Sequence, residues 1–167
     1  MIINVSEIDE NGFELNVVKP NDWLDNINDT DIISFESDLK FDIYLEKIVN
    51  ELSLTGNVEF EISSNCSLCL VDVKEKKDIP LMLILSPDDN DSKDQMDDNF
   101  ETYSGDQIDL SDYLKEQIAL SLPYKVVCSD ECKGLCSNCG INLNKEDCNC
   151  ENNWEDSKFA ILKNIKV

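Results

Sequence analysis

Cysteine spacing is the feature that most constrains how this chain can fold. The 167 residues contain eight cysteines and no histidine, and the cysteines form four short-spaced pairs: Cys66 and Cys69, Cys128 and Cys132, Cys136 and Cys139, Cys148 and Cys150. A short spacing places two sulfurs on one turn, facing the same ion, and four thiolates complete a tetrahedral zinc site that lacks histidine. The pattern therefore predicts two structural Zn²⁺ ions with all eight cysteines as ligands.

The spacing also suggests which pairs share an ion. Residues 135–140 have the form of a zinc knuckle, in which Gly140 allows a positive φ and lets backbone N–H groups point at the sulfurs. We expect one ion on Cys136, Cys139, Cys148 and Cys150, and a second on Cys66, Cys69, Cys128 and Cys132. The second ion would link a hairpin tip to the segment after a helix. Interleaved pairings stay open, as does an arrangement in which Cys66 or Cys128 is an ordinary thiol and only the late cluster binds metal.

The surroundings of these cysteines favour metal over disulfides. The chain opens without a basic segment and an apolar core of signal-peptide length, and its longest apolar run, residues 81–85, is too short to span a bilayer. We therefore expect a soluble, cytoplasmic protein. Thiols stay reduced in that compartment, where paired cysteines usually bind metal or carry out redox chemistry.

The net charge of the chain indicates which class of partner it can bind. There are 36 acidic residues against 14 lysines, no arginine, and a net charge of −22. Such a surface repels phosphate backbones, and without arginine it has no planar fork for guanine edges. A protein partner with basic patches suits the charge better, and direct binding to naked RNA is not expected. The alternative is that the charge only keeps the protein soluble.

The first two-thirds of the chain have the apolar period of two that is typical of half-buried strands. We expect strands over residues 12–18, 41–46 and 58–62, with a turn at Thr55, Gly56 and Asn57. The first cysteine pair then lies on a hairpin tip. Residues 70–73 and 79–85 are expected to form two further strands, the second of them central because it is almost wholly apolar. An antiparallel meander is the simplest topology for these strands.

An acidic loop and two helices complete the predicted organisation. Aspartates crowd residues 87–99, which predicts a loop over about 87–104. Its Asp89 and Asp91 resemble a calcium loop in spacing, but the turn glycine and closing glutamate of such a loop are missing. A helix over 109–122, capped by Asp109 and stopped by Pro123, is expected to pack on the sheet. A last helix is expected over residues 156–163.

These elements define an α+β fold: an antiparallel β-meander packed by one main helix, with a cysteine-rich zinc-binding segment and a short C-terminal helix. We divide the chain into a β-rich domain over residues 1–127, a zinc-knuckle segment over 128–150 and a C-terminal tail or helix over 151–167.

Several blocks of this sequence resemble a known family. The matching blocks, in order along the chain, are residues 66–70, 106–110, 120–123, 128–144, 148–150 and 157–162. Together they resemble the YceD-like family, the large ribosomal RNA subunit accumulation proteins, from about Cys66 to the end of the chain. The resemblance implies a role in the synthesis, processing or accumulation of 23S ribosomal RNA and in ribosome assembly. It implies no catalytic residues.

The residues themselves also predict a scaffold and not an enzyme, because no histidine is present as a general base and no carboxylate pair stands out. The expected partner is a ribosomal protein, an rRNA-processing enzyme or a precursor of the large subunit. The alternative function is a thiol–disulfide redox protein or a redox sensor that releases zinc. That function would require Cys66 or Cys136 to start a helix near a cation, whereas Cys136 lies in a knuckle.

Overall fold

The structure is a computed structural model that describes residues 1–9, 11–24, 33–88 and 100–150. The chain divides into two compact units. The first comprises Met1–Ser64 and Val73–Tyr124, and the second comprises Asn65–Asp72 together with the chain from Lys125 onward. In the described residues the first unit carries nearly all the regular secondary structure, and the second carries all eight cysteines.

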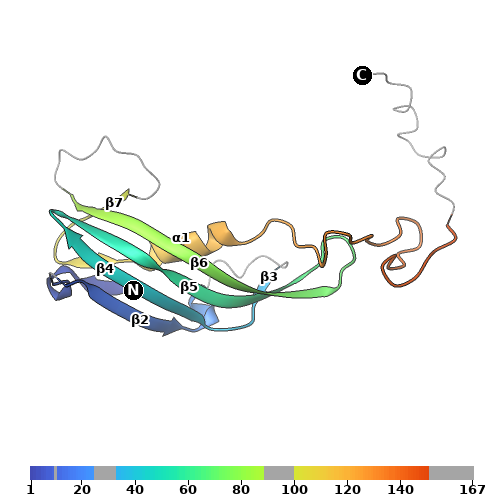
Figure 1. The fold of residues 1–167 in the computed structure, drawn as a ribbon, viewed down its shortest axis with the longest axis horizontal. Helices are drawn as coiled ribbons and strands as arrows, with labels where there is room; N and C mark the ends of the chain where they lie inside the picture. Colours follow the sequence, from blue (N-terminus) through green and yellow to red (C-terminus); the bar gives the residue numbers. More distant parts are fainter. Residues whose placement is uncertain (10, 25–32, 89–99, 151–167) are drawn as a thin grey trace, which may run out of the picture. The chain divides into compact units, whose positions relative to one another are not determined.

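A six-stranded mixed sheet forms the body of the first unit (Figure 1). Its strand order is β2-β4-β5-β6-β7, with β3 also paired to β5. The bounds are β2 (Phe13–Lys19), β3 (Ile33–Phe35), β4 (Leu39–Ile48), β5 (Glu51–Asn65), β6 (Asp72–Pro87) and β7 (Phe100–Tyr103). A separate two-stranded sheet joins β1 (Ile2–Asn4) to β8 (Gln107–Asp109), and 3₁₀ turns cover η1 (Val5–Glu7) and η2 (Asn21–Leu24).

The predicted alternation of apolar and polar residues is confirmed in β4 and β5. Phe41, Ile43 and Leu45 of β4 are buried, and so are Val58 and Phe60 of β5. The residues between them face solvent to varying degrees. Because successive side chains of a strand point to opposite faces, this pattern gives the sheet one apolar face and one wet face. The apolar face forms the core of the unit together with the helix.

The predicted turn at Thr55, Gly56 and Asn57 is wrong. All three residues lie inside β5 and pair with β4, Gly56 opposite Ile43, and the chain reverses instead at residues 49–50. A side chain at position 56 would collide with the backbone carbonyl oxygen of Asp42. The glycine therefore marks a close approach of two strand backbones, which is its other common use within a strand.

The two strands predicted over 70–73 and 79–85 are one strand. β6 runs unbroken from Asp72 to Pro87 and lies between β5 and β7, so β5 is the more central strand. Burial in β6 also alternates, since Leu81 and Leu83 are buried whereas Met82 is 60% exposed. The apolar run predicted a strand correctly, but only alternate side chains of the strand are buried and not all of them.

The antiparallel meander is confirmed only in part. β2, β4 and β5 pair antiparallel in sequence order, but β7 pairs in parallel with β6 at residues 84–87. Residues 100–103 were expected to belong to the acidic loop and instead form β7. Neither β3 nor the β1–β8 sheet was predicted from the sequence. Residues 89–99 lie outside the described part of the chain, and so does the helix predicted over 156–163.

One α-helix, α1 (Ser111–Ser121), packs on the sheet as predicted. It begins two residues later than expected, with Leu110 as N-cap, although the Asp109 carboxylate still accepts a hydrogen bond from the Ser111 N–H at 2.9 Å. It ends as predicted, just ahead of Pro123. Leu110, Leu114 and Ile118 form its buried stripe. No helix in the described ranges has the length and apolar character needed to cross a membrane.

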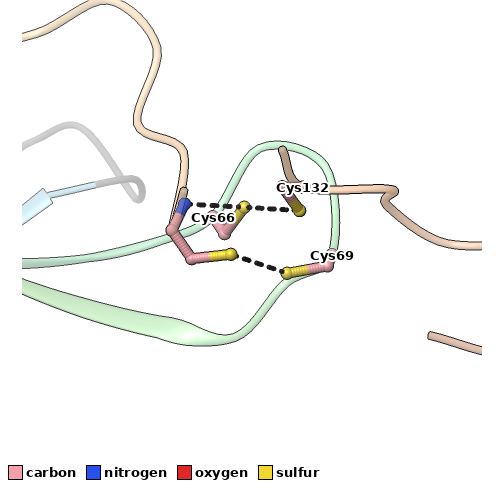
Figure 2. Close-up of side chains that lie close together, drawn as sticks. Cys66, Cys69 and Cys132 are labelled. Atoms are coloured by element: carbon pink, nitrogen blue, oxygen red, sulfur yellow. Dashed lines mark hydrogen bonds between the residues drawn. The ribbon is translucent and has the colours of Figure 1, made fainter. Parts of the chain in front are cut away.

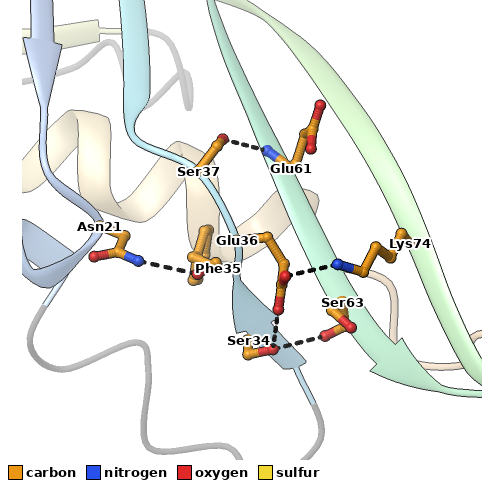
Figure 3. Close-up of polar contacts among 8 residues, drawn as sticks. All are labelled: Asn21, Ser34, Phe35, Glu36, Ser37, Glu61, Ser63 and Lys74. Atoms are coloured by element: carbon orange, nitrogen blue, oxygen red, sulfur yellow. Dashed lines mark hydrogen bonds and ion pairs between the residues drawn. The ribbon is translucent and has the colours of Figure 1, made fainter.

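Polar contacts hold the short strand β3 and the residues after it on the sheet (Figure 3). Glu36 forms an ion pair with Lys74 of β6 at 2.9 Å, and the Ser37 hydroxyl accepts a hydrogen bond from the Glu61 N–H at 2.9 Å. On the other side, Asn21 donates its side-chain N–H to the Phe35 carbonyl at 3.0 Å. These contacts fasten a strand of only three residues to the sheet.

Candidate metal centres

The second unit brings the eight thiols together in two groups of four. One group contains Cys66, Cys69, Cys128 and Cys132, and the other contains Cys136, Cys139, Cys148 and Cys150. Within each group the four sulfurs lie within 4.8 Å of one another. These are the two sets that the spacing of the cysteines predicts, and none of the interleaved pairings is formed.

The first group has the dimensions of a tetrahedral thiolate site. The sulfurs of Cys66 and Cys132 are 3.9 Å apart, and those of Cys69 and Cys128 are 3.6 Å apart. Figure 2 shows the side chains of Cys66, Cys69 and Cys132 converging on one point. A tetrahedron with Zn–S bonds of about 2.3 Å has sulfurs about 3.8 Å apart, so the four thiols fit one zinc ion. Cys66 and Cys69 are buried, as expected for ligands of a structural site.

Both Cys-x-x-Cys pairs adopt the same knuckle. In the first, the Leu70 N–H donates to the Cys66 carbonyl at 2.9 Å, and in the second the Gly140 N–H donates to the Cys136 carbonyl at 2.9 Å. The residue after each pair has a positive φ, 60° at Leu70 and 75° at Gly140. The expectation for Gly140 is therefore confirmed, whereas the same geometry at a leucine was not foreseen.

Backbone hydrogen bonds fasten the two segments of the first group together. The Ser67 N–H donates to the Val126 carbonyl at 2.8 Å, and the Leu135 N–H donates to the Leu68 carbonyl at 2.9 Å. The Cys128 N–H points at the Cys66 sulfur at 3.3 Å. The hairpin tip is thus bonded on both sides to the segment that follows Lys125. Pairs separated by about sixty residues in sequence are held at ligand distance by these contacts.

Backbone N–H donors favour thiolate at Cys136 of the second group and at Cys66 of the first. The N–H groups of Cys139 and Asn138 lower the pKa of Cys136 to about 6. At Cys66, burial acts to raise the pKa, but N–H donors led by that of Leu68 lower it to about 6. A thiolate that accepts such bonds is stabilised before any cation is bound. Each group therefore presents a preformed anionic ligand near neutral pH.

In each group, two thiols have pKa values raised above the ordinary thiol value: Cys69 and Cys128 in the first group, Cys148 and Cys150 in the second. Contact with the Cys132 thiol is the main cause that raises the pKa of Cys128 to about 12, and contact with the Cys139 thiol does the same for Cys150. Like charges at such short separations disfavour one another. Four thiolates can coexist in one group only if a cation compensates them. This chemistry fits a single divalent ion with four sulfur ligands, for which zinc is the common choice.

Two residues of this unit have roles that were not predicted from the sequence. Leu70 occupies the left-handed position described above, and Asn144 donates its side-chain N–H to the Cys132 sulfur at 3.3 Å. Leu70 had a signal, because it follows a Cys-x-x-Cys pair as Gly140 does. Asn144 had only a weak signal in the sequence. Asn142 and Asn144 follow the knuckle, but the neighbouring residues do not indicate that Asn144 contacts Cys132.

Within the described residues, the fold and the two thiol groups define a class of protein: a mixed sheet packed by the helix α1, and a unit whose two four-cysteine groups can each hold a metal ion. Residues 54–166 match the family model described as large ribosomal RNA subunit accumulation protein YceD. This match spans most of the chain and includes all eight cysteines. The chain belongs to the YceD family.

Of two relatives of the chain, one is named as a large ribosomal RNA subunit accumulation protein and the other is uncharacterized. A chloroplastic large ribosomal RNA subunit accumulation protein YCED homolog 1 of Arabidopsis thaliana is 33% identical over 60 residues, which cover 36% of this chain and 19% of that protein. An uncharacterized protein of Mycobacterium tuberculosis is 28% identical over 109 residues, 65% of this chain and 53% of that protein. The chain thus spans about half or less of these relatives. No solved structure matches it.

Proposed function

We propose that this chain is a non-catalytic factor in the accumulation of large-subunit ribosomal RNA and in ribosome assembly, and that two zinc ions order its cysteine-rich unit. The observation that carries the proposal is the family match over residues 54–166. The family is named for accumulation of the large-subunit RNA. The match includes both thiol groups, so the unit that the metals would order belongs to the family's shared region.

The zinc component rests on the geometry of the thiols. Sulfur separations of 3.6 and 3.9 Å suit a tetrahedral ion, and the two knuckles direct backbone N–H groups at sulfurs in the manner of structural zinc sites. Protein purified without chelator should contain two Zn²⁺ per chain and no freely titrating thiols. Elemental analysis that finds fewer than one zinc per chain, or iron in its place, would contradict this component.

The acidic surface supports action through a basic partner. The chain has a net charge of −22, and three lysines of β6 are already paired with glutamates: Lys74 with Glu36, Lys76 with Glu59, Lys77 with Glu75. Such a surface disfavours phosphate backbones and favours basic proteins. We propose a cytoplasmic partner of this kind: a ribosomal protein, an rRNA-processing enzyme or a precursor large-subunit particle that exposes one.

Depletion followed by sedimentation tests the proposed process. Loss of the protein should lower mature large-subunit RNA relative to small-subunit RNA, and the tagged protein should sediment with precursors of the large subunit. Retention on those particles should fall as salt is raised, because opposite charges at a surface are screened. Unchanged subunit ratios after depletion would contradict the process. Tight, salt-sensitive binding of the purified protein to RNA fragments alone would contradict the protein-mediated mechanism.

A second candidate function is thiol redox chemistry, either disulfide exchange or oxidation-driven zinc release. The lowered pKa values of Cys66 and Cys136 favour it, because the thiolate is the reactive form of cysteine. Under this function, oxidised glutathione should release zinc from the loaded protein and form disulfides within each group. Under the assembly function, the loaded protein should keep both ions and all eight thiolates under the same treatment.

A further inference from the structure

Asn144 contacts the first thiol group, although it lies in the loop that connects the two cysteine pairs of the second group. Its side-chain N–H donates to the sulfur of Cys132, a member of the first group, at 3.3 Å. In sequence, however, Asn144 lies between Cys139 and Cys148, which are members of the second group. The residue is therefore placed to respond to the second group and to act on the first.

The orientation of the Asn144 amide is determined by its other hydrogen bonds. Its Oδ1 accepts the Lys133 N–H at 2.9 Å, so the NH₂ end must face the Cys132 sulfur. The same NH₂ group donates to Oδ1 of Asn142 at 2.9 Å, and that oxygen also accepts the Asn144 backbone N–H at 3.0 Å. Both ends of the amide are thus engaged, and the donor is held in one direction.

The loop that carries Asn144 is itself fastened beside the second knuckle. Leu135 and Asn142 form a β-bridge, and the Leu143 N–H donates to the Gly134 carbonyl at 2.9 Å. The Cys136 N–H donates to the Ile141 carbonyl at 2.8 Å. An ion that joins Cys136 to Cys148 would close this loop from its two ends. Closure of the loop by this ion would fix the position from which the Asn144 side chain donates to the Cys132 sulfur.

We propose that Asn144 is a positioning residue that couples the two metal centres, so that filling the second centre strengthens metal binding at the first. A hydrogen bond to a ligand sulfur supports the thiolate and holds its direction, and partners of this kind are typically worth about 10- to 100-fold in metal affinity. Because coupling between binding equilibria is reciprocal, filling the first centre strengthens the second by the same factor. This inference rests on the proposed metal centres.

A mutant cycle with ¹¹³Cd²⁺ as the probe tests the coupling. The parent loaded with two Cd²⁺ should give two resonances, assigned with Cys66→Ser/Cys69→Ser and Cys148→Ser/Cys150→Ser, and chelator competition then gives the affinity of each centre. Asn144→Ala should weaken the first centre about 10-fold and shift its resonance. Cys148→Ser/Cys150→Ser should weaken the first centre by a similar factor, and the combined variant should be no weaker than either.

Two further variants separate the donor role from a structural one. Asn144→Asp keeps an oxygen for the Lys133 N–H but removes the donor to sulfur, so it should not restore first-centre affinity. Asn50→Ala makes the same truncation at an exposed asparagine of the β4–β5 turn, which forms no side-chain hydrogen bond within the described chain, and it should leave both resonances in place.

The possible outcomes each decide a different point. A parent that binds fewer than two Cd²⁺ contradicts the metal centres and the coupling with them. Where the parent binds two, an unchanged first centre in Asn144→Ala contradicts the coupling alone. Additive losses of about 100-fold in the combined variant, or full rescue by Asn144→Asp, contradict it as well.

Discussion

Leu70 and Gly140 occupy equivalent positions, one residue after a Cys-x-x-Cys pair, and both have a left-handed backbone. Glycine adopts this region freely, whereas a residue with a Cβ pays roughly 1–2 kcal/mol. Leu70 is 63% exposed, so packing returns little of that cost. The hydrogen bonds of the knuckle, and the ion we propose there, are what hold the leucine in this conformation.

Exchanging the two side chains should therefore have unequal effects. Leu70→Gly should leave first-centre zinc affinity equal or slightly tighter, because strain is relieved and little contact is lost. Gly140→Leu should weaken the second centre by about 10-fold, the equivalent of about 1.4 kcal/mol. Chelator competition on the two variants measures both effects. Equal losses in the two variants would show that the left-handed position is not what distinguishes them.

Gly56 shows a different use of glycine at the residue scale. Gly56→Ala should destabilise the first unit by roughly 1–3 kcal/mol, because the added methyl meets the Asp42 carbonyl oxygen, an atom of backbone that cannot rotate away. Urea unfolding of Gly56→Ala measures this loss, and Thr55→Ala, at the neighbouring position in β5, is the control. A variant as stable as the parent would mean that β4 and β5 can separate there at no cost.

At the scale of elements, the helix and the sheet meet through a polar contact as well as an apolar one. The Tyr113 hydroxyl donates to the Met82 carbonyl at 2.7 Å and accepts the Met82 N–H at 3.2 Å. One side chain of α1 thereby satisfies both backbone groups of a β6 residue, at a position where β7 does not pair with β6. Burial is the main cause that raises the pKa of Tyr113, which keeps the hydroxyl protonated as a donor.

Tyr113→Phe tests this contact. The variant should lose about 1–2 kcal/mol of unfolding free energy, because two backbone groups of β6 lose their partner while the ring still fills its place in the core. Tyr124→Phe, at a fully exposed tyrosine, should change stability by less than about 0.5 kcal/mol. Similar values for the two variants would mean that solvent replaces the Tyr113 hydroxyl without loss.

At the scale of the whole molecule, the two units are stabilised by different means. Among the residues that the structure describes, the buried apolar core lies in the first unit. In the described part of the second unit, the buried apolar positions are only Cys66, Cys69, Val126 and Cys136. A unit with so little core depends on other interactions, and binding of metal to thiolates can supply its folding free energy.

Metal removal should consequently act on one unit. A strong chelator should abolish hydrogen-exchange protection in residues 66–72 and 125–150, while the amides of β4, β5 and α1 keep theirs. Readdition of Zn²⁺ should restore the lost protection, which serves as the control. A uniform loss of protection across both units would contradict separate stabilisation.

The parts of this protein that the sequence by itself determined are those with local causes. The cysteine spacing predicted the second thiol group, because each of its pairs lies on a single turn and the loop between Cys139 and Cys148 is short enough to close. The first group followed as the four cysteines left over, and its two pairs meet only because the fold brings distant segments together. The alternation in β4 and β5 followed from a period of two, and α1 ends before Pro123 because proline has no N–H to continue the helix.

Tertiary structure alone decided the features that depend on distant partners. Gly56 lies in a strand and not in a turn because β4 approaches it, β7 runs in parallel because β6 offers an open edge, and β1 pairs with β8 across more than a hundred residues. Asn144 likewise acquires its role only where folding places Cys132 beside it. The spacing of residues along the chain does not predict such contacts, because each one forms between two segments that are distant in sequence and meet only in the folded protein.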